Sequence, residues 1–129
     1  MVHWFAVAFI CLSSPVFAQS VNCSDPQTQA DMTYCAGLAF LEADQQLNSA
    51  YRMAIDHARQ RDTGFSDHPS HEDLLRAAQR AWISFRDASC DSQSSISARG
   101  GSMEPMVKLI CLERLSRSRP EELQLFLEW

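Results

Sequence analysis

Cysteine is the residue type in this chain whose number and placement point most clearly to a chemistry. Five cysteines occur among the 129 residues. Cys11 lies in an apolar N-terminal stretch typical of a secretion signal, which leaves Cys23, Cys35, Cys90 and Cys111. An even number of cysteines in a small exported chain predicts disulfides, because compartments outside the cytoplasm are oxidising. We therefore expect two disulfides.

The N-terminal segment has the order of features found in signal peptides. An apolar run over residues 4–12 precedes a plausible cleavage point after Ala18. The run is too short to span a bilayer, which needs roughly 20 apolar residues. Neither nearby cysteine follows the small residue that lipidation requires. We expect residues 1–18 to be a signal peptide and residues 19–129 to form one domain without a membrane anchor, in the periplasm or secreted.

The charge balance restricts the kind of partner. The chain has 16 acidic and 11 basic side chains and a net charge of −5 at pH 7. An acidic surface argues against a nucleic-acid or anionic-membrane partner. It is compatible with a basic protein partner.

Histidines and carboxylates offer other chemistries. His68 and His71, flanked by Asp67, Glu72 and Asp73, could hold a metal, although a charged loop at a helix start is usually solvated. Pairing of the cysteines would leave no thiol nucleophile and no zinc site. The spacing of the acidic residues singles out no pair for glycoside hydrolysis. We expect no catalytic residue, no metal and no cofactor.

The spacing of the apolar residues predicts helices, and these helices would position the cysteines and the other candidate residues. Residues 28–62 predict one long helix, which Thr28 and Asp31 would cap and which a bend near Gly37 could interrupt. Its apolar residues recur every three or four positions: Met32, Cys35, Ala39, Ala43, Leu47, Ala50, Tyr51, Ala54 and Ala58.

A second helix is predicted to begin after Ser70 as its cap. The serine- and glycine-rich residues 91–102 predict a loop. The predicted buried face of the helix that begins after Ser70 consists of Leu74, Ala78, Ala81, Trp82, Phe85 and Ala88.

Ser102 would cap a third helix that ends at Leu115 and tolerates Pro105 in its first turn. Its predicted inward residues are Met106, Ile110 and Leu115, and a short terminal helix opening at residues 118–121 would carry Leu123, Phe126 and Leu127.

No segment alternates with the period of two expected of a strand, so the fold class is all-α. We expect a small antiparallel helical bundle of three main helices plus a short C-terminal helix, with two disulfides. Four cysteines allow three connectivities, and alternating helix directions leave a Cys35–Cys90 bridge open. We prefer Cys23–Cys35, since the N-terminal segment can fold back, and Cys90–Cys111, which would clamp the loop.

Several sequence runs resemble a known family. The resemblance covers about residues 23–125 and is carried by the four cysteines and by motif residues in both halves: Asp44, Leu47, Asn48, Tyr51, the run Gln79–Arg80–Ala81–Trp82, the run Phe85–Arg86–Asp87, the turn Gly100–Gly101–Ser102, and Arg119. The chain resembles the family of small exported domains named for the lysozyme inhibitor LprI. The resemblance implies inhibition of a lysozyme.

The motif residues look like scaffold residues. Trp82 and Phe85 would lie in the core, with a binding platform as the alternative. We expect Arg86 and Asp87 to form an ion pair within the domain or to cap a helix. We expect the same of Arg119. The two glycines indicate a turn with positive φ.

These observations lead to one main hypothesis. A non-enzymatic protein-binding domain would occlude the cleft of a lysozyme-like hydrolase of the cell wall, and a basic lysozyme would suit its acidic surface as a partner. The contacts would come from Arg99, Gly100, Gly101 and Ser102 in the loop. The alternative is a structural or adaptor module of the envelope that binds another protein through a helix face. Wall hydrolysis by a carboxylate pair is a third interpretation.

Overall fold

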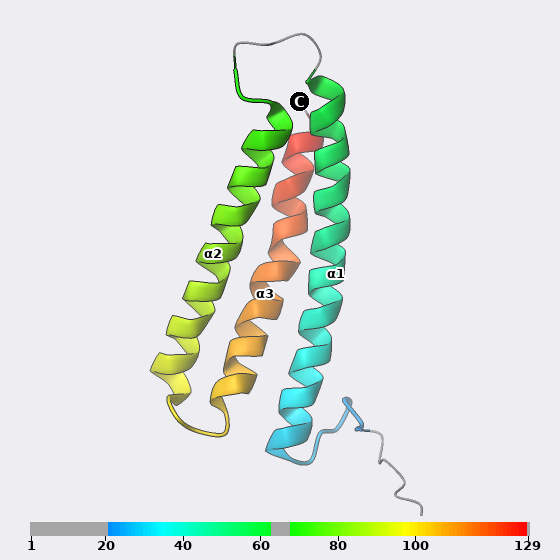
Figure 1. Cartoon of the computed structure of the whole chain (residues 1–129). Helices are drawn as coiled ribbons and strands as arrows, with labels where there is room; N and C mark the ends of the chain where they lie inside the picture. The colour runs from blue at the N-terminus through cyan, green and yellow to red at the C-terminus, as the bar shows by residue number, and fades with distance from the viewer. Residues whose placement is uncertain (1–20, 63–67, 129) are drawn as a thin grey trace, which may run out of the picture.

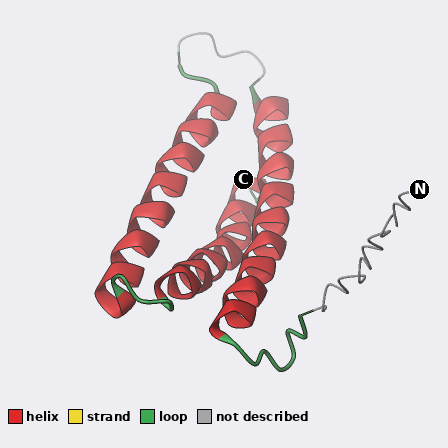
Figure 2. Ribbon diagram, turned by 60° about the horizontal axis from the view of Figure 1, so that its bottom comes forward, coloured by secondary structure: helices red, strands yellow, loops and turns green. Residues whose placement is uncertain are grey.

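The computed structural model describes residues 21–62 and 68–128. They form three helices, α1 (Gln29–Arg61), α2 (His71–Ala98) and α3 (Glu104–Gln124), followed by a 3-10 turn, η1 (Leu125–Leu127). Successive helices run antiparallel (Figure 1), and α3 lies between α1 and α2 (Figure 2). The expected all-α bundle with a short C-terminal piece is confirmed. The predicted signal peptide lies outside the described residues.

Helix α1 begins and ends at polar caps. The Thr28 side chain accepts a hydrogen bond from the Asp31 backbone N–H, and the Asp31 carboxylate accepts one from the Thr28 backbone N–H. The helix continues through Gly37 without a break. At its end, the Asp62 carboxylate accepts hydrogen bonds from the backbone N–H groups of His71 (2.5 Å) and Glu72 (3.1 Å). The end of α1 therefore helps to cap the start of α2, because the first N–H groups of a helix lack partners within it.

The predicted loop over residues 91–102 is wrong, because α2 continues to Ala98. Serine is only modestly less favourable than alanine in a helix. Ser94 is buried against the bundle, and its hydroxyl donates to the Asp91 carbonyl oxygen (3.2 Å). The connection is therefore the short turn of residues 99–103. Met103, not Ser102, occupies the N-cap position of α3.

Helix α3 is longer than predicted and contains Pro120 in its interior. A proline removes one helical hydrogen bond and crowds the preceding turn. The helix nevertheless continues, since residues on both sides of the proline are anchored: Arg119 contacts α2 through Gln79, and Leu123 is buried. The separate C-terminal piece is consequently reduced to η1.

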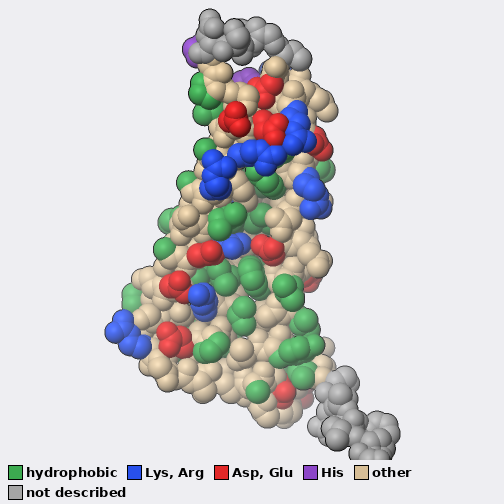
Figure 3. All heavy atoms as spheres, in the orientation of Figure 1, with side chains coloured by type: hydrophobic (Ala, Val, Ile, Leu, Met, Phe, Trp, Pro, Cys, Tyr) green, Lys and Arg blue, Asp and Glu red, His purple; other side chains and the backbone are tan. Residues whose placement is uncertain are grey.

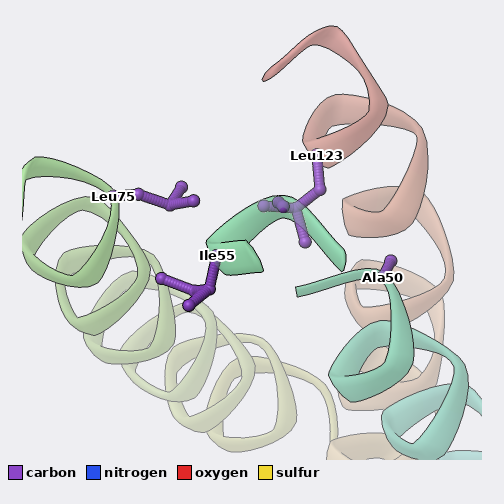
Figure 4. Close-up of a cluster of buried hydrophobic side chains, with 5 residues drawn as sticks. Ala50, Ile55, Leu75 and Leu123 are labelled. Atoms are coloured by element: carbon purple, nitrogen blue, oxygen red, sulfur yellow. The ribbon is translucent and has the colours of Figure 1, made fainter. Parts of the chain in front are cut away.

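Two clusters of buried side chains hold the helices together. In the first, Ala50 and Ile55 of α1 meet Leu75 of α2 and Leu123 of α3 (Figure 4). The second lies nearer the α2–α3 turn and consists of Cys90, Cys111 and Leu112, with Phe40 and Leu115 packed against it.

Both preferred disulfides are confirmed. Cys23–Cys35 joins the N-terminal segment to α1 with a Cα–Cα distance of 5.5 Å, and Cys90–Cys111 joins α2 to α3 with 5.4 Å. The second bridge is fully buried. It therefore links the two helices covalently inside the core.

The predicted buried face of α2 is largely wrong. Leu74 is 55% exposed, Phe85 is 62% exposed, and the three alanines of that face are exposed as well, while Trp82 is partly buried. The buried residues are instead Leu75, Gln79, Arg86, Cys90 and Ser94. Formation of the Cys90–Cys111 bridge turns Cys90 toward α3, and these residues share its side of the helix. Ile110 of α3, predicted to face inward, is also exposed.

No helix in the described part of the chain is long and apolar enough to cross a membrane.

Candidate functional site

The motif residues of the sequence meet around a buried arginine. Arg86 of α2 is only 9% exposed. Its guanidinium donates to the carboxylates of Asp87 (2.9 Å) and Asp44 (3.3 Å) and to the hydroxyl of Ser116 (3.3 Å). Asn48 donates to the same Asp44 carboxylate (2.8 Å). A buried charge is tolerated when it is paired and hydrogen-bonded, so these contacts join all three helices around one cation.

Two guanidinium groups lie close to the ring of Trp82. The central carbon of Arg86 is 5.4 Å from the Trp82 ring and that of Arg119 is 5.3 Å from it. Arg86 also lies 5.6 Å from the Phe40 ring. These distances are typical of cation–π interactions. Trp82 therefore contributes to the packing of α2 on α3.

Arg119 completes this network on α3. It donates to the side-chain oxygen of Gln79 (3.2 Å) and to the Glu122 carboxylate (2.6 Å). Every buried side-chain nitrogen and oxygen in the described residues has a partner. The polar groups on the inner face of α2 are thus satisfied within the bundle.

The remaining motif residues divide into interior and surface positions. Leu47 is buried, and Tyr51 packs against the first cluster. Arg80 is exposed, and Phe85 is exposed instead of lying in the core as predicted. The buried motif residues are therefore Leu47, Gln79, Arg86 and Arg119.

The predicted partner-binding residues lie in the turn between α2 and α3. Gly100 has a φ of +72°, which favours glycine, and its backbone N–H donates to the Glu104 carboxylate (2.6 Å). The Gly101 N–H donates to the Ala98 carbonyl (2.9 Å). The Arg99 Nε donates to the Ser95 hydroxyl (2.9 Å). These bonds give the turn a definite shape.

The turn is an exposed end of the bundle (Figure 1). Arg99, Gly100, Gly101 and Ser102 are all exposed. The two helices that lead to the turn are joined by the Cys90–Cys111 bridge. An ion pair between Lys108 and Asp91 also joins them. The four residues therefore form a small, braced projection.

A charged cluster near the opposite end connects α1 with α2. Glu72 receives hydrogen bonds from Arg59 of α1 (2.7 and 2.9 Å) and from Arg76 of α2 (2.8 and 2.5 Å). The hydrogen bonds from Arg59 and then from Arg76 lower the pKa of Glu72 to about 2. Acidic and basic side chains gather in this upper region of the surface (Figure 3). The cluster is an interhelical link.

In the part of the chain that the structure describes, the histidines do not lie in a group of potential metal ligands. His68 and His71 are exposed, and His57 is partly buried. No group of three potential metal ligands occurs among residues 21–62 and 68–128. Asp67, which the sequence placed beside these histidines, lies outside the described residues.

An apolar pocket lies beside this end of the bundle. It has a volume of about 620 Å³. It opens where α1 and the start of α2 meet the C-terminal turn, and its lining includes His57, His71, Leu74, Ala78 and Phe126. The sequence reasoning missed this pocket because its lining comes from three separated segments.

Comparisons with known proteins agree with this architecture. The sequence profile described as "Lysozyme inhibitor LprI" matches residues 22–123. An uncharacterized protein of Rhizobium meliloti is 35% identical over 125 residues, which cover 92% of this chain and 89% of that protein. The lipoprotein LprI of Mycobacterium tuberculosis is 30% identical over 76 residues, which cover 59% of this chain. The match spans about a third (32%) of that lipoprotein.

A solved structure has the same fold. The crystal structure of a DUF1311 family protein from Pseudomonas putida superimposes with a TM-score of 0.64 at 25% sequence identity, and the match covers 81% of this chain and 96% of that chain. Because the profile match includes α1, α2, nearly all of α3 and both disulfides, this chain belongs to the lysozyme inhibitor LprI family.

Proposed function

We propose that this protein is an exported, non-enzymatic inhibitor that binds a lysozyme-like cell-wall hydrolase and occludes its substrate cleft. The observation that carries the proposal is the family match over residues 22–123, which includes the α2–α3 turn and the network that supports it. Residues 1–18 would direct export as a signal peptide and would then be removed. Two disulfides are consistent with function in an oxidising compartment.

The shape of the turn supports cleft occlusion. Gly100 and Gly101 carry no side chains, so a target could approach their backbone closely. The two helices that lead to the turn are joined at Cys90 and Cys111. A preformed projection loses little conformational freedom on binding, which favours affinity.

Arg99 provides the chemical complement to a hydrolase cleft. Glycoside hydrolases of the lysozyme type use a pair of carboxyl groups. The Arg99 Nε is held by Ser95, and the side chain is exposed, so its remaining N–H groups can reach a partner. A guanidinium can bind a carboxylate through two parallel hydrogen bonds. Arg99 would therefore bind the catalytic carboxylates of the target.

The net charge would assist the encounter. A protein of net charge −5 is attracted to a basic lysozyme over distances that salt screens. Added salt should therefore slow association more than it weakens the final contacts.

The test is an inhibition assay on the oxidised protein. Lysis of peptidoglycan by a panel of lysozymes is measured against inhibitor concentration at two salt concentrations, with the wild type and Arg99→Ala. Arg52→Ala is the matched control, because it removes the same charge from an exposed position on α1. We expect the wild type and the control to inhibit equally and Arg99→Ala to inhibit at least tenfold less.

Two results would contradict the proposal. Lack of inhibition of any lysozyme by the wild type would refute the function and favour the envelope adaptor. Equal inhibition by Arg99→Ala would refute the placement of the contact at the turn.

A further inference from the structure

A long apolar face of α2 points away from the bundle. Leu74 is 55% exposed, Phe85 is 62% exposed and Ile96 is 84% exposed. They lie on one side of the helix together with smaller residues, and we call this set the outer face of α2: Leu74, Ala78, Ala81, Phe85, Ala88, Ser89, Ser92 and Ile96. Hydrophobic side chains follow the edge of the molecule along α2 (Figure 3). None of the eight residues is charged.

The large side chains of the outer face are evenly spaced. Leu74, Phe85 and Ile96 are each separated by 11 residues. Eleven residues complete about three helical turns, so the three side chains form a nearly straight row along the helix. Alanines and serines occupy the positions between them.

Apart from Ala88, whose counterpart is Trp82, the outer face of α2 has matching positions in both directions from Phe85. If two copies of α2 pair antiparallel about a two-fold axis at Phe85, Leu74 of one copy lies opposite Ile96 of the other. In the same register, Ala78 lies opposite Ser92, so small residues meet small residues. A two-fold interface requires one surface patch that is complementary to itself. The outer face of α2 meets that requirement.

The apolar pocket fits the same register. Leu74 and Ala78 contribute to its lining, together with Phe126. Since Ile96 of a second copy would lie opposite Leu74, its highly exposed side chain would reach the mouth of this pocket. A large exposed side chain and a pocket would thus face each other at both ends of the pair.

Area and charge also favour a second copy. Pairing would bury the exposed side chains of Leu74, Phe85 and Ile96 from both copies, which contributes to the roughly 1,200–2,000 Å² that stable interfaces bury. Two copies that each carry a net charge of −5 repel each other, and a face without charged residues minimises that repulsion.

We propose that the outer face of α2 is a homodimer interface in which two copies pair antiparallel about Phe85. The pairing directs the two α2–α3 turns to opposite ends of the dimer, where each lies opposite the start of α2 in the other copy. It does not depend on the identity of the inhibited enzyme, so it can fail or succeed independently of the proposed function.

Sedimentation velocity of the oxidised protein over a hundredfold concentration range tests the dimer. The wild type should reach twice the mass of one chain, and Phe85→Glu should remain at the mass of one chain with unchanged helical circular dichroism. Leu41→Glu is the matched control, because Leu41 is similarly exposed (56%) on α1. It should dimerise like the wild type. A monomeric wild type would overturn the proposal and would favour another protein as the partner of this face. A dimer that persists in Phe85→Glu would also overturn it. The same holds for a dimer that is lost equally in Leu41→Glu.

Cross-linking tests the register without relying on Phe85→Glu. Leu74→Cys and Ile96→Cys proteins are mixed under mild oxidation, and each is also oxidised alone. We expect a covalent dimer in the mixture and little with Leu74→Cys alone. Absence of the mixed dimer, or efficient linkage between two Leu74→Cys copies, would overturn the antiparallel arrangement.

Discussion

Replacement of Arg86 by methionine tests the interpretation of the buried network. Methionine keeps an unbranched apolar stem of similar length but removes the guanidinium. The variant loses hydrogen bonds to Asp44, Asp87 and Ser116 and the contacts with the rings of Trp82 and Phe40. The Arg86 guanidinium makes all of these contacts, so a single substitution removes them together.

The expected loss follows from the surroundings of each partner. The carboxylates of Asp44 and Asp87 are 35% and 49% exposed, so water replaces much of what they lose. The Ser116 hydroxyl is buried and loses a donor, which costs about 1 kcal/mol. Each cation–π contact contributes about 0.5–1 kcal/mol. These losses sum to about 2–3 kcal/mol and the partly exposed ion pairs add little, so we expect Arg86→Met to lower the free energy of unfolding by about 2–3 kcal/mol.

Urea unfolding followed by helical circular dichroism measures this loss. Arg99→Met is the control, because Arg99 is exposed and bonds only to Ser95 among the described residues. The control should unfold at nearly the wild-type urea concentration. If Arg86→Met unfolds at the same midpoint as Arg99→Met, the network does not stabilise the fold and the reasoning is wrong.

Three further predictions address other parts of the bundle. The pKa of Glu72 is lowered from 4.5 to about 2 in the folded protein, so the stability that its carboxylate contributes is complete above pH 4.5 and is lost as the pH falls toward 2. The difference in stability between the wild type and Glu72→Gln should therefore shrink as the pH falls over this range in acid titrations. A constant difference would contradict this prediction. Removal of the buried disulfide by Cys90→Ala and Cys111→Ala should lower stability by about 3 kcal/mol from loop entropy alone, and unchanged thermal unfolding would refute this estimate. Gly100→Ala should cost about 1 kcal/mol because of the positive φ, and urea unfolding that shows no loss would argue against this backbone conformation.

The helical periodicity predicted α1 well for a local reason. Its caps, Thr28 with Asp31 and then Asp62, are set by residues close in sequence. Its apolar stripe is also its buried stripe, since Ala43 and Leu47 are among the buried residues. Where local preference and tertiary packing agree, the sequence pattern alone is sufficient.

Helix α2 shows where that reasoning fails. Its more apolar face is exposed, whereas the face with Gln79 and Arg86 is buried. A prediction based on hydrophobicity alone places these polar groups on the surface, because burial of an unpaired polar group costs free energy. That cost is offset by Asp44 of α1 and Arg119 of α3, which are distant in sequence. The preferred pairing of Cys90 with Cys111 was a usable signal, because it implies that the Cys90 side of the helix faces α3.

The prediction of the α2–α3 turn was correct in its glycines and wrong in its length. The two adjacent glycines indicated a turn, and Gly100 has the positive φ that such a turn requires. The length of the loop was overestimated, since local composition does not reveal that residues 91–98 remain helical when Ser94 is buried between helices joined by a disulfide.

The sequence by itself determined the all-α class, the α1 caps and the presence of a glycine turn between α2 and α3, because each depends on nearby residues, and it favoured the observed cysteine pairs while leaving a Cys35–Cys90 bridge open. The tertiary structure alone decided the rotation of α2. That rotation buries Arg86 among partners from all three helices and leaves Phe85 exposed. The physical reason is that the free energy of burying a polar group depends on partners from distant segments, which only the packed bundle brings within hydrogen-bonding distance.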